Sequence, residues 1–162
     1  MTLLHLFIVN KSGGLIYHRE LSRYAPSIDV NVLLRIGSTF HSLCSIAVEA
    51  SPVKGRDAKS VEDDGIEIIR GDSVILCCFQ TRTGIKFVVT AEPGTQGLKK
   101  LLKTVYVLYA DCTLKDPFYE LDMPIRCELF SQAIDDLVEK SDSESKSNSN
   151  SRGRDESIVK LR

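Results

Sequence analysis

The chain has 162 residues, with 21 Lys and Arg against 22 Asp and Glu, so its formal net charge is −1. Such a balance argues against a surface devoted to nucleic-acid phosphates or anionic lipid, and we expect no nucleic-acid partner. No apolar run approaches the ~20 residues of a membrane span, and no basic segment precedes the apolar start as in an export signal. Five cysteines without such a signal indicate a reducing, cytoplasmic setting.

The first structural signal is a β-hairpin. Residues 3–9 are apolar almost throughout, residues 10–14 read Asn-Lys-Ser-Gly-Gly, and the extended pattern resumes at residues 15–17. Asn and Gly tolerate the backbone angles of tight hairpin turns. The segment therefore predicts two antiparallel strands.

A helix is predicted next, capped by Ser27 or Asp29 and ending before Pro52. Its apolar positions recur at spacings of three and four: Leu33, Ile36, Phe40, Leu43, Cys44 and Ala47. Residues 53–64 are small and charged without periodicity, which indicates a surface loop. No secondary structure is expected there.

Three strands follow in residues 66–70, 74–81 and 85–91, and their short connections predict an antiparallel meander. The middle one is apolar at every position, so we expect both of its faces to be covered. Its adjacent residues Cys77 and Cys78 should point to opposite faces, because consecutive side chains on a strand alternate in direction. We therefore expect two separate core thiols.

Two amphipathic helices close the domain. One has an apolar stripe of Leu98, Leu101, Leu102, Val105, Leu108, Tyr109 and Cys112. The other has Leu129, Ala133, Ile134 and Leu137, with Pro124 placed at its start. The expected fold class is α+β, a five-stranded antiparallel sheet with one helix on one face and two on the other, because each stripe needs a partner.

Residues 1–140 form the predicted domain, and residues 141–162 the predicted disordered polar tail. The tail begins with Ser141, Ser143 and Ser145 between acidic residues, an arrangement suited to phosphorylation by kinases that read acidic flanks. A solubilising segment is the simpler interpretation.

Catalysis and metal binding find little support. The three histidines lie on separate predicted elements, and no Cys-x-x-Cys is present, so we expect no metal and no cofactor. His41 and Cys44 lie one helical turn apart and make a cysteine-dependent enzyme the different-class alternative. However, Cys44 belongs to the apolar stripe, where we expect its thiol to stay protonated and inert. We expect no catalytic residues.

Several segments resemble the synbindin family of subunits of the TRAPP vesicle-tethering complex. Residues 10–17 are similar to the family's opening hairpin, residues 40–43 to the centre of its first helix, and residues 80–88 to its second hairpin. The longest match is residues 114–119 continuing through residues 123–130. Some relatives carry a PDZ-like domain between the second strand and the first helix, where this chain has only residues 20–28, so functions of that insert are not expected here.

The resemblance implies a longin (profilin-like) fold and a non-catalytic role in ER-to-Golgi transport. It implies a second longin subunit and α/β subunits as partners, with peripheral membrane association through the complex. The assembled complex would act as nucleotide exchange factor for a Rab GTPase of the early secretory pathway. A longin SNARE or an adaptor small chain is the alternative within trafficking, but the polar end has no heptads and an adaptor chain lacks the string at residues 123–130.

Two surfaces are candidates for contact with a subunit or the Rab. The first is the apolar, proline-braced loop comprising Asp116, Pro117, Phe118, Tyr119, Met123, Pro124, Ile125 and Arg126. Its residues could equally pack inward, and Arg126 is its expected polar anchor. The second and weaker candidate is on the hairpin: Gln80, Thr81, Thr83 and Lys86.

Overall fold

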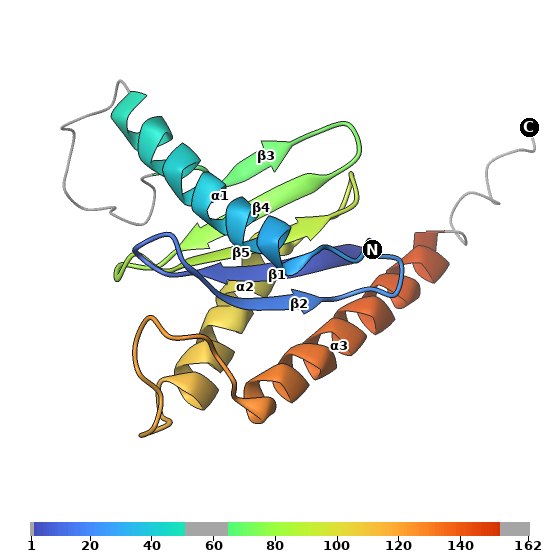
Figure 1. Cartoon of the computed structure of the whole chain (residues 1–162). Helices are drawn as coiled ribbons and strands as arrows, with labels where there is room; N and C mark the ends of the chain where they lie inside the picture. The colour runs from blue at the N-terminus through green and yellow to red at the C-terminus, as the bar shows by residue number, and fades with distance from the viewer. Residues whose placement is uncertain (1, 51–64, 153–162) are drawn as a thin grey trace, which may run out of the picture.

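The computed structural model describes residues 2–50 and 65–152, which form a five-stranded antiparallel sheet with helices on both faces (Figure 1). The strands are β1 (Leu3–Val9), β2 (Leu15–Glu20), β3 (Ile68–Arg70), β4 (Ile75–Gln80) and β5 (Lys86–Ala91). Their order in the sheet is β2-β1-β5-β4-β3, so both the opening hairpin and the predicted meander are confirmed. The predicted loop at residues 53–64 lies outside the described part of the chain.

The turn between β1 and β2 is held by one side chain. Asn10 Oδ1 accepts hydrogen bonds from the backbone N–H of Gly14 at 2.7 Å and of Ser12 at 3.1 Å. Gly13 has a φ of 87°, and a Cβ there would lie 3.1 Å from the His41 ring. Glycine is therefore required by both the backbone angle and the space.

Helix α1 (Val30–Ala50) crosses one face of the sheet (Figure 1). Asp29 caps it, since its carboxylate accepts from the Asn31 N–H at 3.1 Å. The buried positions are Leu33, Gly37, Phe40 and Cys44. The predicted stripe is correct except at Leu43, which is exposed, because the contact with the sheet is narrower than the apolar sequence pattern.

Strand β4 separates two cores, as expected. Cys77 faces the larger core beneath the C-terminal helices, and Cys78 faces the smaller core beneath α1. Both thiols are buried and unbridged. The β3 strand at the sheet edge is exposed along its whole length.

The other face is covered by α2 (Leu98–Leu108), the π-helical turn η2 (Tyr109–Thr113) and α3 (Glu128–Arg152). The α2 stripe is confirmed, with Leu98, Leu101, Leu102 and Val105 buried. Edge-to-face aromatic contacts join the layers, with ring centroids 5.5 Å apart for Phe87 and Tyr109 and 5.0 Å for Tyr17 and Phe130. One helix on one face and two on the other is therefore the observed architecture.

The last helix differs from the prediction at both ends. It begins at Glu128, so Pro124 lies in the preceding loop rather than at the helix start. Leu129 is 69% exposed, and the neighbouring Phe130 occupies the core position assigned to it. The helix also continues to Arg152, through residues expected to lack structure, because each further residue of an established helix adds a backbone hydrogen bond.

Candidate functional site

The loop between η2 and α3 is ordered by bonds at its base. The Ile125 N–H donates to the Ile16 carbonyl at 2.8 Å, which fastens the loop to β2. The Cys127 thiol lies 3.7 Å from the Cys112 carbonyl and closes the two ends of the loop. The segment is thus held in one shape at the edge of the domain (Figure 1).

The middle of the loop is tied to the tip of the β1–β2 hairpin. Asn10 Nδ2 donates to the Asp122 carbonyl at 3.4 Å, and Lys11 Nζ lies 3.9 Å from the Asp122 carboxylate. Asp122 has a φ of 71°, a left-handed angle that Asp tolerates better than most residues. The Tyr119 hydroxyl donates to the Met123 carbonyl at 3.1 Å. These bonds make the loop one unit with the hairpin.

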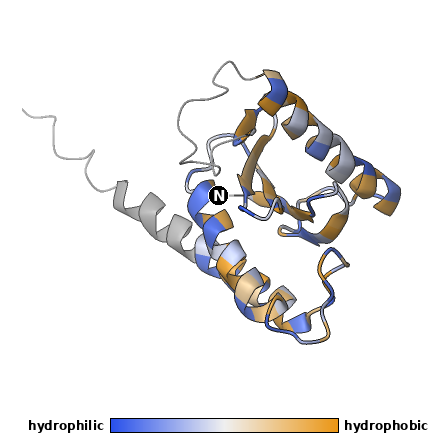
Figure 2. Cartoon of the chain, turned by 90° about the vertical axis from the view of Figure 1, so that its left-hand side faces the viewer, coloured by the Kyte–Doolittle hydropathy of each residue, from blue (hydrophilic) through white to orange (hydrophobic). Residues whose placement is uncertain are grey.

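The apolar residues predicted in this loop separate into two groups. Ile125 belongs to the core, and Tyr119 packs against it, so neither is a freely exposed contact as the sequence allowed. Phe118 is 92% exposed, and Leu121 and Met123, three and five residues further along the loop, are exposed as well. Asp116, Pro117, Pro124 and Arg126 are exposed as well. We name Phe118, Leu121 and Met123 the loop tip; Figure 2 shows apolar residues along this loop where it projects from the domain.

The hairpin patch is less available than the sequence suggested. Thr81 is buried and its hydroxyl serves the turn, accepting from the Ile85 N–H at 3.1 Å and lying 2.9 Å from the Thr83 hydroxyl. Lys86 is only 5% exposed, and its ammonium donates to His41 Nδ1 at 3.2 Å. Gln80 and Thr83 remain the reachable members of the patch.

The His41 and Cys44 pair is not arranged as a nucleophile and base. The His41 ring contacts Gly13 and the Lys86 ammonium, and burial, followed by the Lys86 charge, lowers the pKa of His41. A hydrogen bond from the Cys78 thiol lowers the pKa of Cys44, and burial opposes this shift. Cys44 is nevertheless buried, which keeps substrates away from its sulfur.

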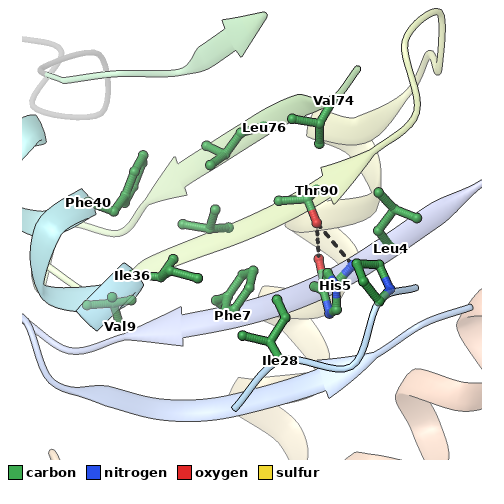
Figure 3. A pocket seen from close by; sticks show the side chains of 13 residues that line it. Leu4, His5, Phe7, Val9, Ile28, Ile36, Phe40, Val74, Leu76 and Thr90 are labelled. Atoms are coloured by element: carbon green, nitrogen blue, oxygen red, sulfur yellow. Dashed lines mark hydrogen bonds between the residues drawn. The ribbon is translucent and has the colours of Figure 1, made fainter. Parts of the chain in front are cut away.

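An apolar cavity of about 270 Å³ lies between α1 and the sheet (Figure 3). Side chains of β1, β4, β5 and α1 line it, among them Phe7, Ile36, Phe40, Leu76 and Val88. His5 is at its wall, where its backbone N–H and carbonyl meet the Thr90 hydroxyl at 3.1 and 3.5 Å. Among the described residues, the space between α1 and the sheet is therefore not completely filled.

Further exposed apolar residues, which were not predicted from the sequence, lie on α1 and on the edge strand β3. On α1 they lie on the two flanks of the buried face: Val30, Leu34 and Val48 on one and Leu43 and Ile46 on the other. On β3 they are Ile68 and Ile69, which point to opposite faces of the sheet. The signal was present: apolar residues occur on more of the circumference of α1 than one sheet contact can bury.

Three other expectations concern metal binding, membrane-spanning helices and the serines of the polar tail. No cluster of three potential metal-ligating side chains is found among the described residues. None of the helices within residues 2–50 and 65–152 is long and apolar enough to cross a membrane. At the start of the polar segment, the Ser141 hydroxyl donates to the Val138 carbonyl at 2.7 Å, whereas the side chains of Ser143 and Ser145 lie outside the described part.

Comparison with known proteins identifies the family. Residues 3–141 match the model of the Sybindin-like family. The chain belongs to this family. It is 46% identical over 138 residues to trafficking protein particle complex subunit 4 of Dictyostelium discoideum, covering 85% of this chain and 97% of that protein.

A second relative is longer than this chain. The match to trafficking protein particle complex subunit 4 of Bos taurus is 48% identical over 107 residues, covering 66% of this chain but 46% of that protein, so the chain spans about half its length. Among solved structures, a Roadblock/LC7 domain from Streptomyces avermitilis aligns with a TM-score of 0.47 at 15% identity, covering 66% of this chain and 85% of that one.

Proposed function

We propose that this chain is a core subunit of the TRAPP vesicle-tethering complex that acts by binding other proteins. The observation that carries the proposal is the match to the Dictyostelium subunit, which covers nearly that whole protein at 46% identity. The partners we propose are a second longin subunit, α/β subunits and a Rab GTPase of the early secretory pathway. The setting is cytoplasmic, at Golgi and ER-to-Golgi membranes, with membrane contact made through the complex.

The proposed activity of the assembled complex is nucleotide exchange on the Rab. An exchange factor binds the nucleotide-free GTPase better than the loaded one, so its binding energy displaces GDP without any proton-transfer group. The described residues of this chain fit such a role, since their surface offers exposed apolar side chains and the Cys44 thiol is buried.

The loop between η2 and α3, which carries the loop tip, is our proposed contact with a neighbouring subunit or the Rab. Exposed aromatic and long apolar side chains on an ordered segment are typical of interaction hot spots. Arg126 is exposed and has no ion-pair partner among the residues that the structure describes, so it remains the proposed polar anchor. Gln80 and Thr83 form the weaker second patch.

The test is a reconstituted complex with and without this chain, in which release of labelled GDP from the Rab is measured. We expect accelerated release only when the chain is present in the complex, and none from the chain alone. If the chain alone accelerated release, or if the complex lacking it were fully active, the proposed function would be wrong.

A further inference from the structure

The loop tip exposes apolar side chains on a backbone that is held by hydrogen bonds. Phe118 is 92% exposed, yet the loop beneath it is fixed by the Ile125–Ile16 and Tyr119–Met123 hydrogen bonds and by the contacts of Asp122 with the hairpin. The Phe118 N–H itself is held by the Asp116 carboxylate at 2.9 Å. A side chain on such a preorganised segment loses little conformational entropy on binding, which favours its use as an anchor.

Acidic residues outnumber basic ones around the tip. Asp116, Glu120 and Asp122 are exposed within residues 116–123, and the nearest basic residues along the loop are Lys115 and Arg126. Lys115 pairs with Asp111 and Lys11 pairs with Asp122, while Asp116 and Glu120 have no ion-pair partner in the described part of the chain. The unpaired carboxylates of Asp116 and Glu120 therefore adjoin the apolar side chains of the tip in the sequence, and the exposed cation Arg126 follows them beyond Ile125.

We propose that the loop tip inserts into an apolar pocket with a basic rim on a neighbouring subunit of the complex. This inference rests on the proposed function, because it takes the partner to be a subunit. Phe118 fills the pocket with Leu121 and Met123 beside it, and Glu120 and Asp116 meet Lys or Arg side chains at the rim. Such a rim matches the tip in charge and would speed encounter at low salt.

Two exposed aromatic residues provide a matched pair of variants. Phe118→Ala removes the proposed anchor, and Tyr24→Ala removes an aromatic side chain that is 88% exposed in the segment between β2 and α1. Because both side chains are exposed, neither change should unfold the domain, and unchanged thermal unfolding would verify this. We expect Phe118→Ala to weaken incorporation into the reconstituted complex by about 30-fold or more, the effect of losing a hot spot. Tyr24→Ala should change it by less than about twofold.

The chemistry of the partner is tested by crosslinking and by salt. With p-benzoylphenylalanine at position 118, we expect crosslinks to one subunit, in a segment where apolar residues are flanked by Lys or Arg; at position 24, we expect none to that segment. Glu120→Lys should slow association and reduce its dependence on salt.

The inference and the proposed function fail in different ways. A wild-type chain that does not enter the complex would overturn the proposed function. A wild-type chain that enters, with Phe118→Ala entering equally well or crosslinks from position 118 reaching a segment without basic residues, would overturn only the basic-rimmed pocket.

Discussion

At the scale of single residues, the boundary between core and surface in α3 falls between two neighbours. Phe130 is completely buried between Tyr17 and Tyr109, whereas Leu129 is 69% exposed. We predict that Phe130→Ala lowers the free energy of unfolding by about 3–5 kcal/mol, while Leu129→Ala changes it by less than ~0.5 kcal/mol. Urea unfolding of the two variants measures the difference, and equal losses would show that the helix is rotated from its assigned position.

Two stacked histidines, His5 and His18, should make stability depend on pH. Burial, as the largest cause, lowers the pKa of both His5 and His18, and the two rings stack 5.4 Å apart. Because the folded chain then binds protons less readily than the unfolded chain, stability is fully present above pH ~6.5 and is lost as the pH falls through the lowered values.

We predict that the melting temperature falls between pH 7.5 and pH 5 in the wild type, and that His5→Phe reduces this slope. Burial also lowers the pKa of His41, so His41→Asn should reduce the slope as well. Tyr24→Ala is the control, because Tyr24 is an exposed side chain that is not a histidine. Thermal unfolding across this pH range is the measurement. A slope unaffected by His5→Phe would assign the pH dependence to other groups.

The residues whose burial differs from the sequence-based expectation have one thing in common. Their burial depends on contacts between distant parts of the chain, which the spacing of apolar residues does not determine. Leu129 and Phe130 both satisfy a helical apolar pattern, and adjacent residues differ by about 100° around the helix, so sequence alone does not fix which one faces the sheet. Lys86 looked like a surface cation, but its stem is buried and its ammonium reaches His41. Ile125 is drawn into the core by the hydrogen bond of its own N–H to Ile16.

At the scale of elements, the loop between η2 and α3 depends on the left-handed backbone of Asp122. A β-branched residue is strained at such an angle, so we predict that Asp122→Val costs about 1–2 kcal/mol and loosens the loop. Asp122→Gly is the control, since Gly accepts this angle, although it also loses the ion pair with Lys11. Faster hydrogen exchange of the Ile125 N–H in Asp122→Val, but not in Asp122→Gly, is the expected result. Equal protection in both variants would mean that this angle does not hold the loop.

The polar continuation of α3 is the second prediction at this scale. Among the α3 residues whose burial the structure describes, 128–141, the buried ones lie before Lys140, and the sequence from Ser141 to Arg152 is polar. Deleting residues 141–162 should therefore change the free energy of unfolding by less than about 0.5 kcal/mol and leave assembly intact. Urea unfolding and incorporation into the complex are the measurements, and failure to assemble would show that the segment is itself a contact.

Elements with strong local signals were the ones that the sequence could predict. The Asn10–Gly14 turn, the Asp29 cap and the α2 stripe are all present, because each depends on interactions within a few residues. The start of α3 was predicted incorrectly. Pro124 suits a first helical turn, but here it lies in the loop that the Ile125 N–H joins to β2. Interactions between residues close in sequence determine which elements form. Contacts between distant residues determine where some of these elements begin and end.

At the scale of the whole molecule, the sheet is covered on both faces, and exposed apolar residues remain on the loop tip, α1 and β3, among other places. The fold class was predictable, since each amphipathic stripe needed a face of the sheet. The exposed surfaces were predictable only in part. The loop was recognised from its composition, whereas the exposed apolar residues of α1 can be identified only once its buried face is known.

The central claim is that this chain works by holding other proteins in the TRAPP complex. The most direct measurement is native mass spectrometry of the tagged chain, purified from the cells that produce it. The account predicts a particle in which one copy of the chain is joined by several other TRAPP subunits. A chain recovered alone, or only as copies of itself, would contradict it.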